Sequence, residues 1–146
     1  MKKNNKGFSL VELIVVILIM AIIAVALAPQ VMKWVDKSKV NTDINNRANL
    51  KSSMDAAVAD YFSQGKSFTA PLTFTVDGTV SGLDSADTAF KNAANEVLND
   101  SWPEFESTTD GYFKVTISEK GVVTVEVYKG VSGEDYNDGR GVQSGT

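Results

Sequence analysis

A single carboxylate lies inside an apolar segment near the start of the chain, and this feature constrains the fold more than any other. The segment runs from Phe8 to Ala28, and from Leu13 onward it contains no charged residue. An acidic side chain within a membrane helix costs roughly 2.5–3.5 kcal/mol on insertion scales. We therefore expect Glu12 to have a function. Two structural explanations stay open beside it: a protonated carboxyl, or a side chain that reaches back to the membrane interface.

The same segment has the length of a membrane-spanning helix. At about 1.5 Å per residue, residues 8–28 form a helix of about 31 Å, close to the hydrocarbon thickness of a bilayer. The stretch before it contains three lysines and no acidic residue. By the positive-inside rule this charge predicts a cytoplasmic N-terminus. We expect one crossing of the cytoplasmic membrane, preceded by a leader at residues 1–7.

Two ordinary explanations of this N-terminus stay open. A secretory signal has a basic start, a shorter apolar stretch and an A-x-A cleavage site, which residues 24–26 or 26–28 provide. Pro29 directly after the second site and Glu12 inside the apolar stretch both disfavour a signal. A permanent single-helix anchor explains the length and the lysines, but it leaves Glu12 without a purpose.

Residues 6–13 resemble the start of type IV pilins and of the related pseudopilins of type II secretion. Lys6-Gly7 is followed by Phe8-Ser9-Leu10-Val11-Glu12, which is the family's order of glycine, aromatic residue and glutamate before an apolar run. The resemblance implies cleavage after Gly7 by a prepilin peptidase, methylation of the new Phe8 amine, and a role of Glu12 in assembly. It covers about residues 2–62, and beyond these it is only architectural.

Physical reasoning supplies a mechanism for Glu12. Cleavage would give Phe8 an ammonium group one helical turn away, so a charge-assisted contact can form within one chain or between neighbours. In a low dielectric, the paired carboxylate is far more stable than an isolated one. We expect Glu12 to meet the Phe8 amine of an adjacent subunit, which would drive docking and set the axial register.

The helix is predicted to continue past the apolar segment. Pro29 lacks an amide donor and should kink or locally open the helix without ending it. From residue 31 to residue 62, apolar residues recur mostly three or four positions apart, which indicates an amphipathic helix that ends near Gly65. Trp34 and the rest of this stripe are predicted to pack in a core.

The C-terminal half is predicted to contain a small antiparallel sheet. Residues 72–76 alternate toward a turn at Asp77-Gly78, and residues 112–117 and 122–128 form the clearest hairpin. A helix is expected between them over residues 85–98, with Ser85 or Asp84 as its cap.

The expected fold class is α+β, and the pilin resemblance implies the same arrangement. A long N-terminal helix, membrane-spanning at residues 8–28 and amphipathic at 29–64, packs against the sheet of a globular head at 65–130. The tail at 131–146 is rich in Gly, Asp, Asn and Ser, so we expect it to be polar and flexible. Pairing of part of this tail along a sheet edge stays open.

The composition excludes most catalytic chemistry. The sequence contains no cysteine and no histidine, so it lacks disulfides, the commonest general base and most transition-metal ligands. The paired carboxylates Glu104 and Glu106 are interpreted as solvated loop residues. We expect no enzymatic activity and no cofactor. Because acidic residues outnumber basic ones, with a formal net charge of -4, we expect no nucleic-acid partner.

The acidic tail contains a weak calcium candidate. Glu134, Asp135, Asn137 and Asp138 offer oxygen ligands in one short stretch, the chemistry that calcium accepts, and the resemblance to pseudopilins also suggests calcium there. The spacing does not fit an EF-hand, and a solvated acidic tail is the alternative. We therefore assign no metal site from the sequence.

The resemblance implies a structural subunit, and a major pilin in particular, of a type IV pilus-like filament that serves adhesion or motility. Its expected partners are other copies of itself, the prepilin peptidase and methyltransferase, an inner-membrane assembly platform, and membrane lipid before assembly. The precursor would lie in the cytoplasmic membrane and the assembled filament outside the cell. Two alternatives stay open: a pseudopilin of a secretion or DNA-uptake system, and a membrane-tethered domain that binds carbohydrate. Exposed aromatic residues grouped on the head, drawn from Trp102, Phe105, Tyr112 and Tyr136, would favour the binding domain.

Overall fold

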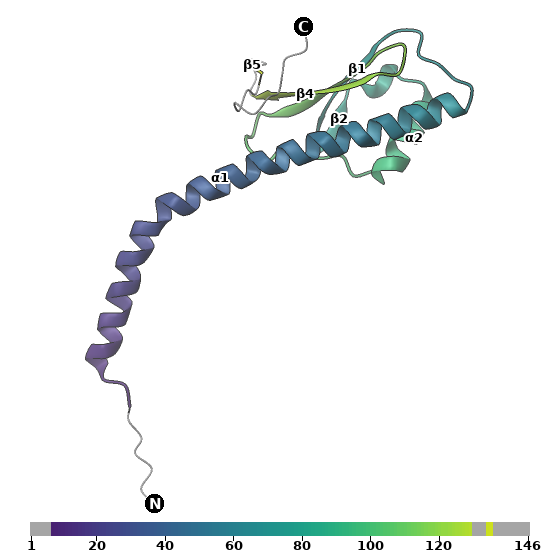
Figure 1. The fold of residues 1–146 in the computed structure, drawn as a ribbon. Helices are drawn as coiled ribbons and strands as arrows, with labels where there is room; N and C mark the ends of the chain where they lie inside the picture. Colours follow the sequence, from purple (N-terminus) through teal and green to yellow (C-terminus); the bar gives the residue numbers. More distant parts are fainter. Residues whose placement is uncertain (1–6, 130–133, 136–146) are drawn as a thin grey trace, which may run out of the picture. The chain divides into compact units, whose positions relative to one another are not determined.

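The computed structural model describes residues 7–129 and 134–135. The elements, in chain order, are α1 (Leu10–Ser63), β1 (Leu72–Asp77), β2 (Thr79–Ser81), a 3-10 turn (Leu83–Ser85), α2 (Thr88–Leu98), β3 (Tyr112–Ile117), β4 (Val123–Lys129) and β5 (Glu134–Asp135) (Figure 1). The chain divides into two compact units, residues 1–38 and residues 39–146. We call them the N-terminal unit and the head unit and describe each by itself.

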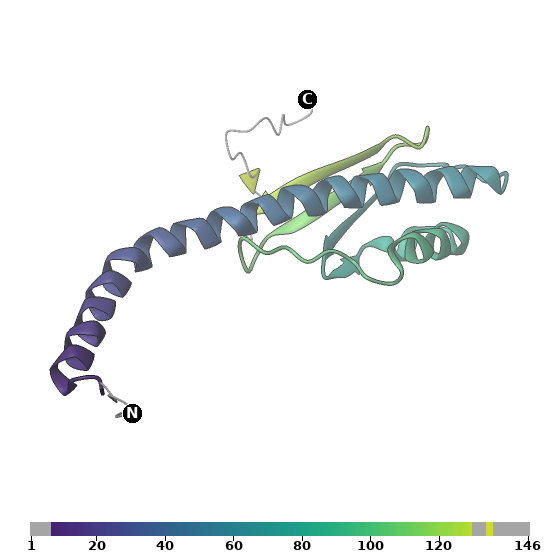
Figure 2. The same cartoon turned by 60° about the horizontal axis from the view of Figure 1, so that its bottom comes forward.

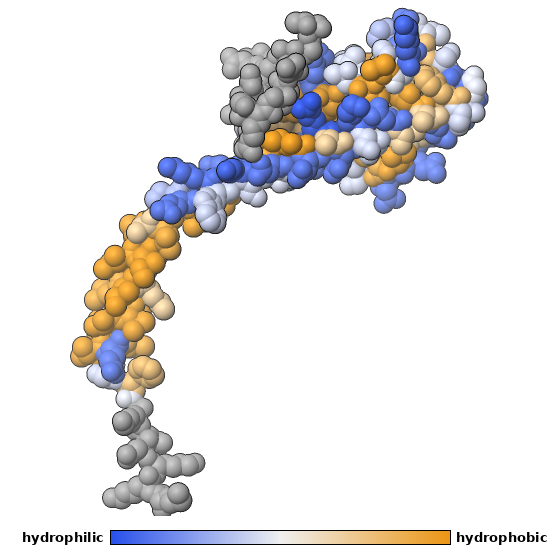
Figure 3. All heavy atoms as spheres, viewed as in Figure 1, coloured by the Kyte–Doolittle hydropathy of each residue, from blue (hydrophilic) through white to orange (hydrophobic). Residues whose placement is uncertain are grey.

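In the N-terminal unit, the apolar side chains of α1 are exposed. Figure 3 shows a hydrophobic surface over most of the described part of this unit, with a hydrophilic patch near its start and hydrophilic side chains again toward its end. Pro29 lies inside α1 and does not end it. The prediction that Trp34 packs in a core is wrong, because Trp34 is 79% exposed. The buried apolar stripe of α1 begins only at Leu50, where the sheet packs against the helix.

The end of α1 agrees with the prediction of a stop at Gly65. The helix ends at Ser63, and Gly65 has a positive φ of 75°. The Gly65 amide donates to the Phe62 carbonyl at 2.9 Å, which satisfies a carbonyl that the helix leaves free. A side chain with a Cβ would be strained at this φ, which explains why glycine suits the position.

The head unit contains a five-stranded sheet with the order β2-β1-β3-β4-β5, in which every neighbouring pair is antiparallel. The predicted β3–β4 hairpin is confirmed, with Phe113 opposite Val127 and Ile117 opposite Val123. The sequence reasoning missed β2, which folds back on β1 through a turn at Gly78 with φ of 62°.

The predicted flexible tail lies mostly outside the described residues. Within it, Glu134–Asp135 form β5, and their backbone pairs with Lys129 and Tyr128 of β4. This is the edge pairing that the sequence left open.

The core lies between one face of the sheet, the second half of α1, and α2. Figures 1 and 2 show this part of α1 along the sheet, with α2 beside its end. Residues 50, 54, 57, 58 and 61 of α1 follow the helical period and are buried, so they form one stripe. The other large contributors to the core are Phe74, Val76, Phe90, Phe113, Val115 and Ile117.

Helix α2 begins three residues later than predicted, and its cap is neither Ser85 nor Asp84. Asp87 is the N-cap, and its Oδ1 accepts a hydrogen bond from the Ala89 amide at 2.9 Å. Ser85 and Asp84 belong to the preceding 3-10 turn. Ala86 is extended, with φ of -77° and ψ of 151°, which separates that turn from the helix.

A buried carboxylate joins α1 to the loop between α2 and β3. Asp43 is 1% exposed and accepts hydrogen bonds from the backbone amides of Glu106 and Ser107, at 2.7 and 3.0 Å. One turn later, the Arg47 Nε donates to the Val125 carbonyl at 2.9 Å. Because these polar groups lie one helical turn apart, one side of α1 holds both the loop and β4 in place.

Candidate functional site

Gly7 and Phe8 precede α1 and are exposed, and neither belongs to a helix or strand. Phe8 is 88% exposed. A Cβ built on Gly7 would have no atom within 4 Å, and Gly7 is not among the glycines with positive φ. Neither packing nor backbone conformation within this chain therefore requires glycine at position 7.

The helix begins with a reciprocal cap formed by Ser9 and Glu12. The Ser9 Oγ accepts a hydrogen bond from the Val11 amide at 3.3 Å, and the Glu12 Oε2 accepts one from the Ser9 amide at 2.8 Å. The Ser9 carbonyl accepts the first bond of the helical ladder, from the Leu13 amide at 3.2 Å. Ser9 is thus the N-cap and Glu12 the third helical residue, which is the arrangement of a capping box.

This cap matters more in a membrane than it would in water. The first four amide groups of a helix have no partner in the helical ladder, and an unpaired amide in hydrocarbon costs several kcal/mol. Ser9 and Glu12 satisfy the Val11 and Ser9 amides. Sequence reasoning missed Ser9, although a serine three residues before a glutamate at the start of an apolar run is a known signature of a helix start.

Among the described residues, α1 is the one helix long and apolar enough to cross a membrane, judged by length and composition. The predicted processing residues Gly7 and Phe8 shortly precede this helix, and the predicted assembly residue Glu12 lies in its first turn. Pro29 lies farther along the same helix, and the kink expected there stays a prediction.

The aromatic residues of the head do not form an exposed cluster among the described residues. Phe105 is buried. Trp102 is half-buried and lies edge-to-face with Phe74, with the ring centroids 6.2 Å apart. Tyr112 is half-buried and stacks on Tyr128, with the ring centroids 5.3 Å apart. Tyr136 lies outside the described residues. Of the candidate rings that lie in the described residues, only Phe105 is buried, so the carbohydrate-binding alternative stays untested.

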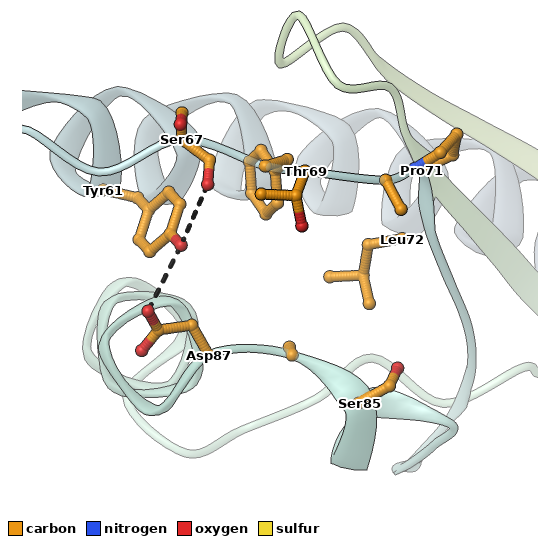
Figure 4. Close-up of a pocket in the computed structure, with 10 residues that line it drawn as sticks. Tyr61, Ser67, Thr69, Pro71, Leu72, Ser85 and Asp87 are labelled. Carbon is orange, nitrogen blue, oxygen red and sulfur yellow. Dashed lines mark hydrogen bonds between the residues drawn. The ribbon is translucent and has the colours of Figure 1, made fainter.

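A shallow pocket of about 470 Å³ lies between the loop after α1 and the start of α2 (Figure 4). Asp87 at its edge is already engaged, because its carboxylate accepts from the Tyr61 hydroxyl at 3.3 Å and from the Lys66 Nζ at 3.1 Å. The Ala89 amide and Lys66 lower the pKa of Asp87, while burial and the nearby Asp87 charge raise the pKa of Tyr61. These contacts join the two segments, so we interpret Asp87 as a structural residue.

Over residues 7–128, no three His, Cys, Asp or Glu side chains are grouped to hold a metal ion. Asn137 and Asp138 of the calcium candidate lie outside the described residues, as do the side chains of Glu134 and Asp135. The calcium candidate therefore stays untested.

Comparisons with known proteins give two matches. One covers the N-terminal part of the chain, and the other covers about half of the chain. A family model described as the prokaryotic N-terminal methylation motif matches residues 2–28. The "Type IV major fimbrial protein FimA" of Dichelobacter nodosus is 29% identical over 68 residues, which cover 47% of this chain and 44% of that protein. The chain thus spans less than half the length of this curated relative. No solved structure matches. The two matches confirm the resemblance to the type IV pilins.

Proposed function

We propose that this type IV pilin-like chain is the major structural subunit of a type IV pilus-like filament. The chain is processed after Gly7 and assembles through α1. The observation that carries this proposal is the exposed apolar surface of the N-terminal unit, which contains a lone carboxylate, Glu12, four residues after Phe8 in the non-helical Gly7-Phe8 junction. The relative from Dichelobacter nodosus is by its description a major fimbrial protein, which supports the major role.

The apolar surface requires a partner other than water. Side chains from Leu10 to Val35 are exposed along α1, including Ile22 at 70%. Burying such surface is worth about 25 cal/mol per Å², so the surface will be covered by lipid or by protein. In the precursor, the cytoplasmic membrane covers it, with the N-terminus inside. In the filament, α1 helices of other copies replace the lipid.

Processing fits the surroundings of Gly7. Because the chain itself does not require glycine there, a requirement for glycine would come from an enzyme that binds this residue. We propose a prepilin peptidase as this enzyme, with methylation of the freed Phe8 amine following cleavage. An inner-membrane assembly platform would then receive the mature subunit.

Assembly gives Glu12 its counter-ion. Its Oε2 is already engaged by the Ser9 amide, while a carboxylate has a second oxygen and further lone pairs that can accept an ammonium group. The Phe8 ammonium of a neighbouring subunit would donate to these remaining acceptor positions of Glu12 as both helices leave the lipid. Adhesion or motility would then be a property of the polymer, and the head would act as its outer spacer.

The decisive experiment is mass analysis of the N-terminus of the chain from native cells, together with mechanical shearing. We expect a mature chain that begins at methylated Phe8 and is released in sheared fibres. An intact Met1 in the membrane fraction would overturn the proposal in favour of a permanent anchor. A mature chain that stays with the cells after shearing would instead assign the subunit to a pseudopilus.

A further inference from the structure

We propose that the Ser9–Glu12 cap keeps the Gly7–Phe8 peptide bond outside the helix, so that Ser9 and Glu12 are positioning residues for processing. This inference rests on the proposed cleavage after Gly7. It gives Glu12 a role before assembly that depends on a hydrogen-bond acceptor and does not depend on its charge.

The hydrogen bonds of the cap determine where α1 can begin. For the helix to extend over Phe8 and Gly7, the Glu12 and Val11 amides would have to donate to the Phe8 and Gly7 carbonyls. In the structure the Val11 amide donates to the Ser9 Oγ at 3.3 Å instead. The Glu12 Oε2 accepts from the Ser9 amide at 2.8 Å and so holds Ser9 in the cap position. As long as both contacts persist, the helix starts at Leu10 and the two residues before Ser9 remain non-helical.

A non-helical junction is what an endopeptidase needs. In a helix, the carbonyl and the amide of each peptide bond are engaged in the ladder and shielded by neighbouring side chains. Gly7 and Phe8 are exposed and lie outside the helix, so the Gly7 carbonyl is open to attack. Hydrolysis consumes one water, breaks the bond between Gly7 and Phe8, and leaves a carboxylate on Gly7 and an ammonium group on Phe8.

The cap survives cleavage, which separates its two roles in time. The Ser9 amide is one residue beyond the cleaved bond and keeps its hydrogen, so the Glu12 Oε2 keeps this donor in the mature chain. The new ammonium group must then use the remaining acceptor capacity of the same carboxylate. One side chain thus first sets the start of the helix and afterwards binds the charge that processing creates.

Glutamate and glutamine both serve at the third position of a capping box, and threonine substitutes for serine as the cap. The cap therefore predicts a pattern of rescue that a charge mechanism does not. Glu12→Gln keeps the acceptor and loses the charge, whereas Glu12→Ala loses both. Ser9→Thr keeps the hydroxyl, whereas Ser9→Ala loses it. Val11→Ala is the matched control, because it trims a neighbouring side chain and retains both backbone donors of the cap.

The test uses the full-length precursor in detergent micelles with purified prepilin peptidase, and it measures two quantities. The first is kcat/KM for release of residues 1–7, followed by mass spectrometry. The second is hydrogen exchange at the Ser9 and Val11 amides in the absence of the peptidase. Loss of an N-cap typically shifts a helix-start equilibrium by about fivefold. We expect Ser9→Ala and Glu12→Ala each to exchange about fivefold faster at these amides and to be cleaved a few-fold more slowly.

The conservative variants and the double variant complete the test. Glu12→Gln, Ser9→Thr and Val11→Ala should remain within about twofold of the natural chain in both measurements. Ser9→Ala combined with Glu12→Ala should lose less than the product of the two single effects, because the two residues act as one unit.

The outcomes distinguish the cap from the proposed function itself. A natural precursor that is not cleaved after Gly7 would overturn the proposed function and the role of the cap with it. Normal cleavage of the natural precursor, with Ser9→Ala and Glu12→Ala cleaved equally fast, would overturn only the cap. Slow cleavage of Glu12→Gln, to the level of Glu12→Ala, would show that charge and not the acceptor matters, and would also overturn it.

Discussion

The same helix passes through two regions of this chain, and its apolar residues have opposite surroundings in the two. In the N-terminal unit Ile22 is 70% exposed, whereas in the head unit Leu50 is completely buried. Both residues are apolar and both belong to α1. The difference lies in what faces the helix, because a sheet and a second helix cover only its second half. Apolar character alone thus does not distinguish a core helix from one that needs lipid or another subunit.

The largest effect on the first region is expected from removal of its carboxylate. Glu12→Ala and Glu12→Gln should both insert in the membrane, yet lower the yield of sheared filament by more than about tenfold, because the Phe8 ammonium loses its partner in a low dielectric. Immunoblots of sheared and membrane fractions would measure this yield. Thermal unfolding of the head unit should stay unchanged. Normal filament yield from both variants would remove the assembly role of Glu12.

A large effect on the second region is expected from truncation of a core ring. Phe113 is completely buried in the sheet, so Phe113→Ala should lower the free energy of unfolding by about 3–5 kcal/mol. The matched substitution in the other region, Ile22→Ala, should change it by less than about 0.5 kcal/mol, because no core surrounds Ile22. Denaturant titration of both variants in detergent makes the comparison, and similar losses for the two would contradict the division into two units.

The polar contact between α1 and the loop before β3 should have an intermediate effect. Asp43→Ala leaves the amides of Glu106 and Ser107 without their acceptor. The expected loss is about 1–3 kcal/mol of unfolding free energy. Asp36→Ala, an exposed carboxylate on α1 in the N-terminal unit, is the control and should lose almost nothing. Equal unfolding curves for Asp43→Ala and the natural chain would show that the loop does not depend on this carboxylate.

The smallest effect is a change in pH dependence at Asp87. Its pKa lies below the ordinary value of 3.8, chiefly because the Ala89 amide and Lys66 stabilise the charged form. A lowered pKa means that the stabilisation is present above the ordinary value and is lost as the pH falls through the lowered one. The variant Asp87→Asn should therefore show a weaker loss of stability on acidification below about pH 4. Acid titrations monitored by circular dichroism would measure it, and identical acid transitions would contradict this role.

Several features could be predicted because the signal is local. The β3–β4 hairpin follows from strict alternation on both sides of a turn, and the end of α1 follows from an apolar stripe that stops before Gly65. The cap at the start of α1 could also have been predicted from the sequence. Ser9 carries its signature in the spacing to Glu12, and this signature was missed because the glutamate was interpreted only as a charge.

Other features depend on contacts between distant residues. Asp84, Ser85 and Asp87 are all good helix caps, and the choice of Asp87 reflects its contacts with Tyr61 near the end of α1 and with Lys66 in the loop that follows. Asp43 is a polar residue on an amphipathic helix, which normally indicates a solvated face. Its burial follows from the two backbone amides that the loop at 106–107 brings to it.

Local sequence is sufficient to show that a membrane-length apolar helix with one carboxylate follows a glycine-phenylalanine junction, because length, charge and spacing are properties of neighbouring residues. Which part of that helix is a core element depends on the fold. Burial requires a partner surface, and for α1 this surface is assembled from strands and a helix that lie far away in the sequence. The tertiary structure likewise decided that Asp43 serves packing, because its hydrogen-bond donors come from a loop more than sixty residues away.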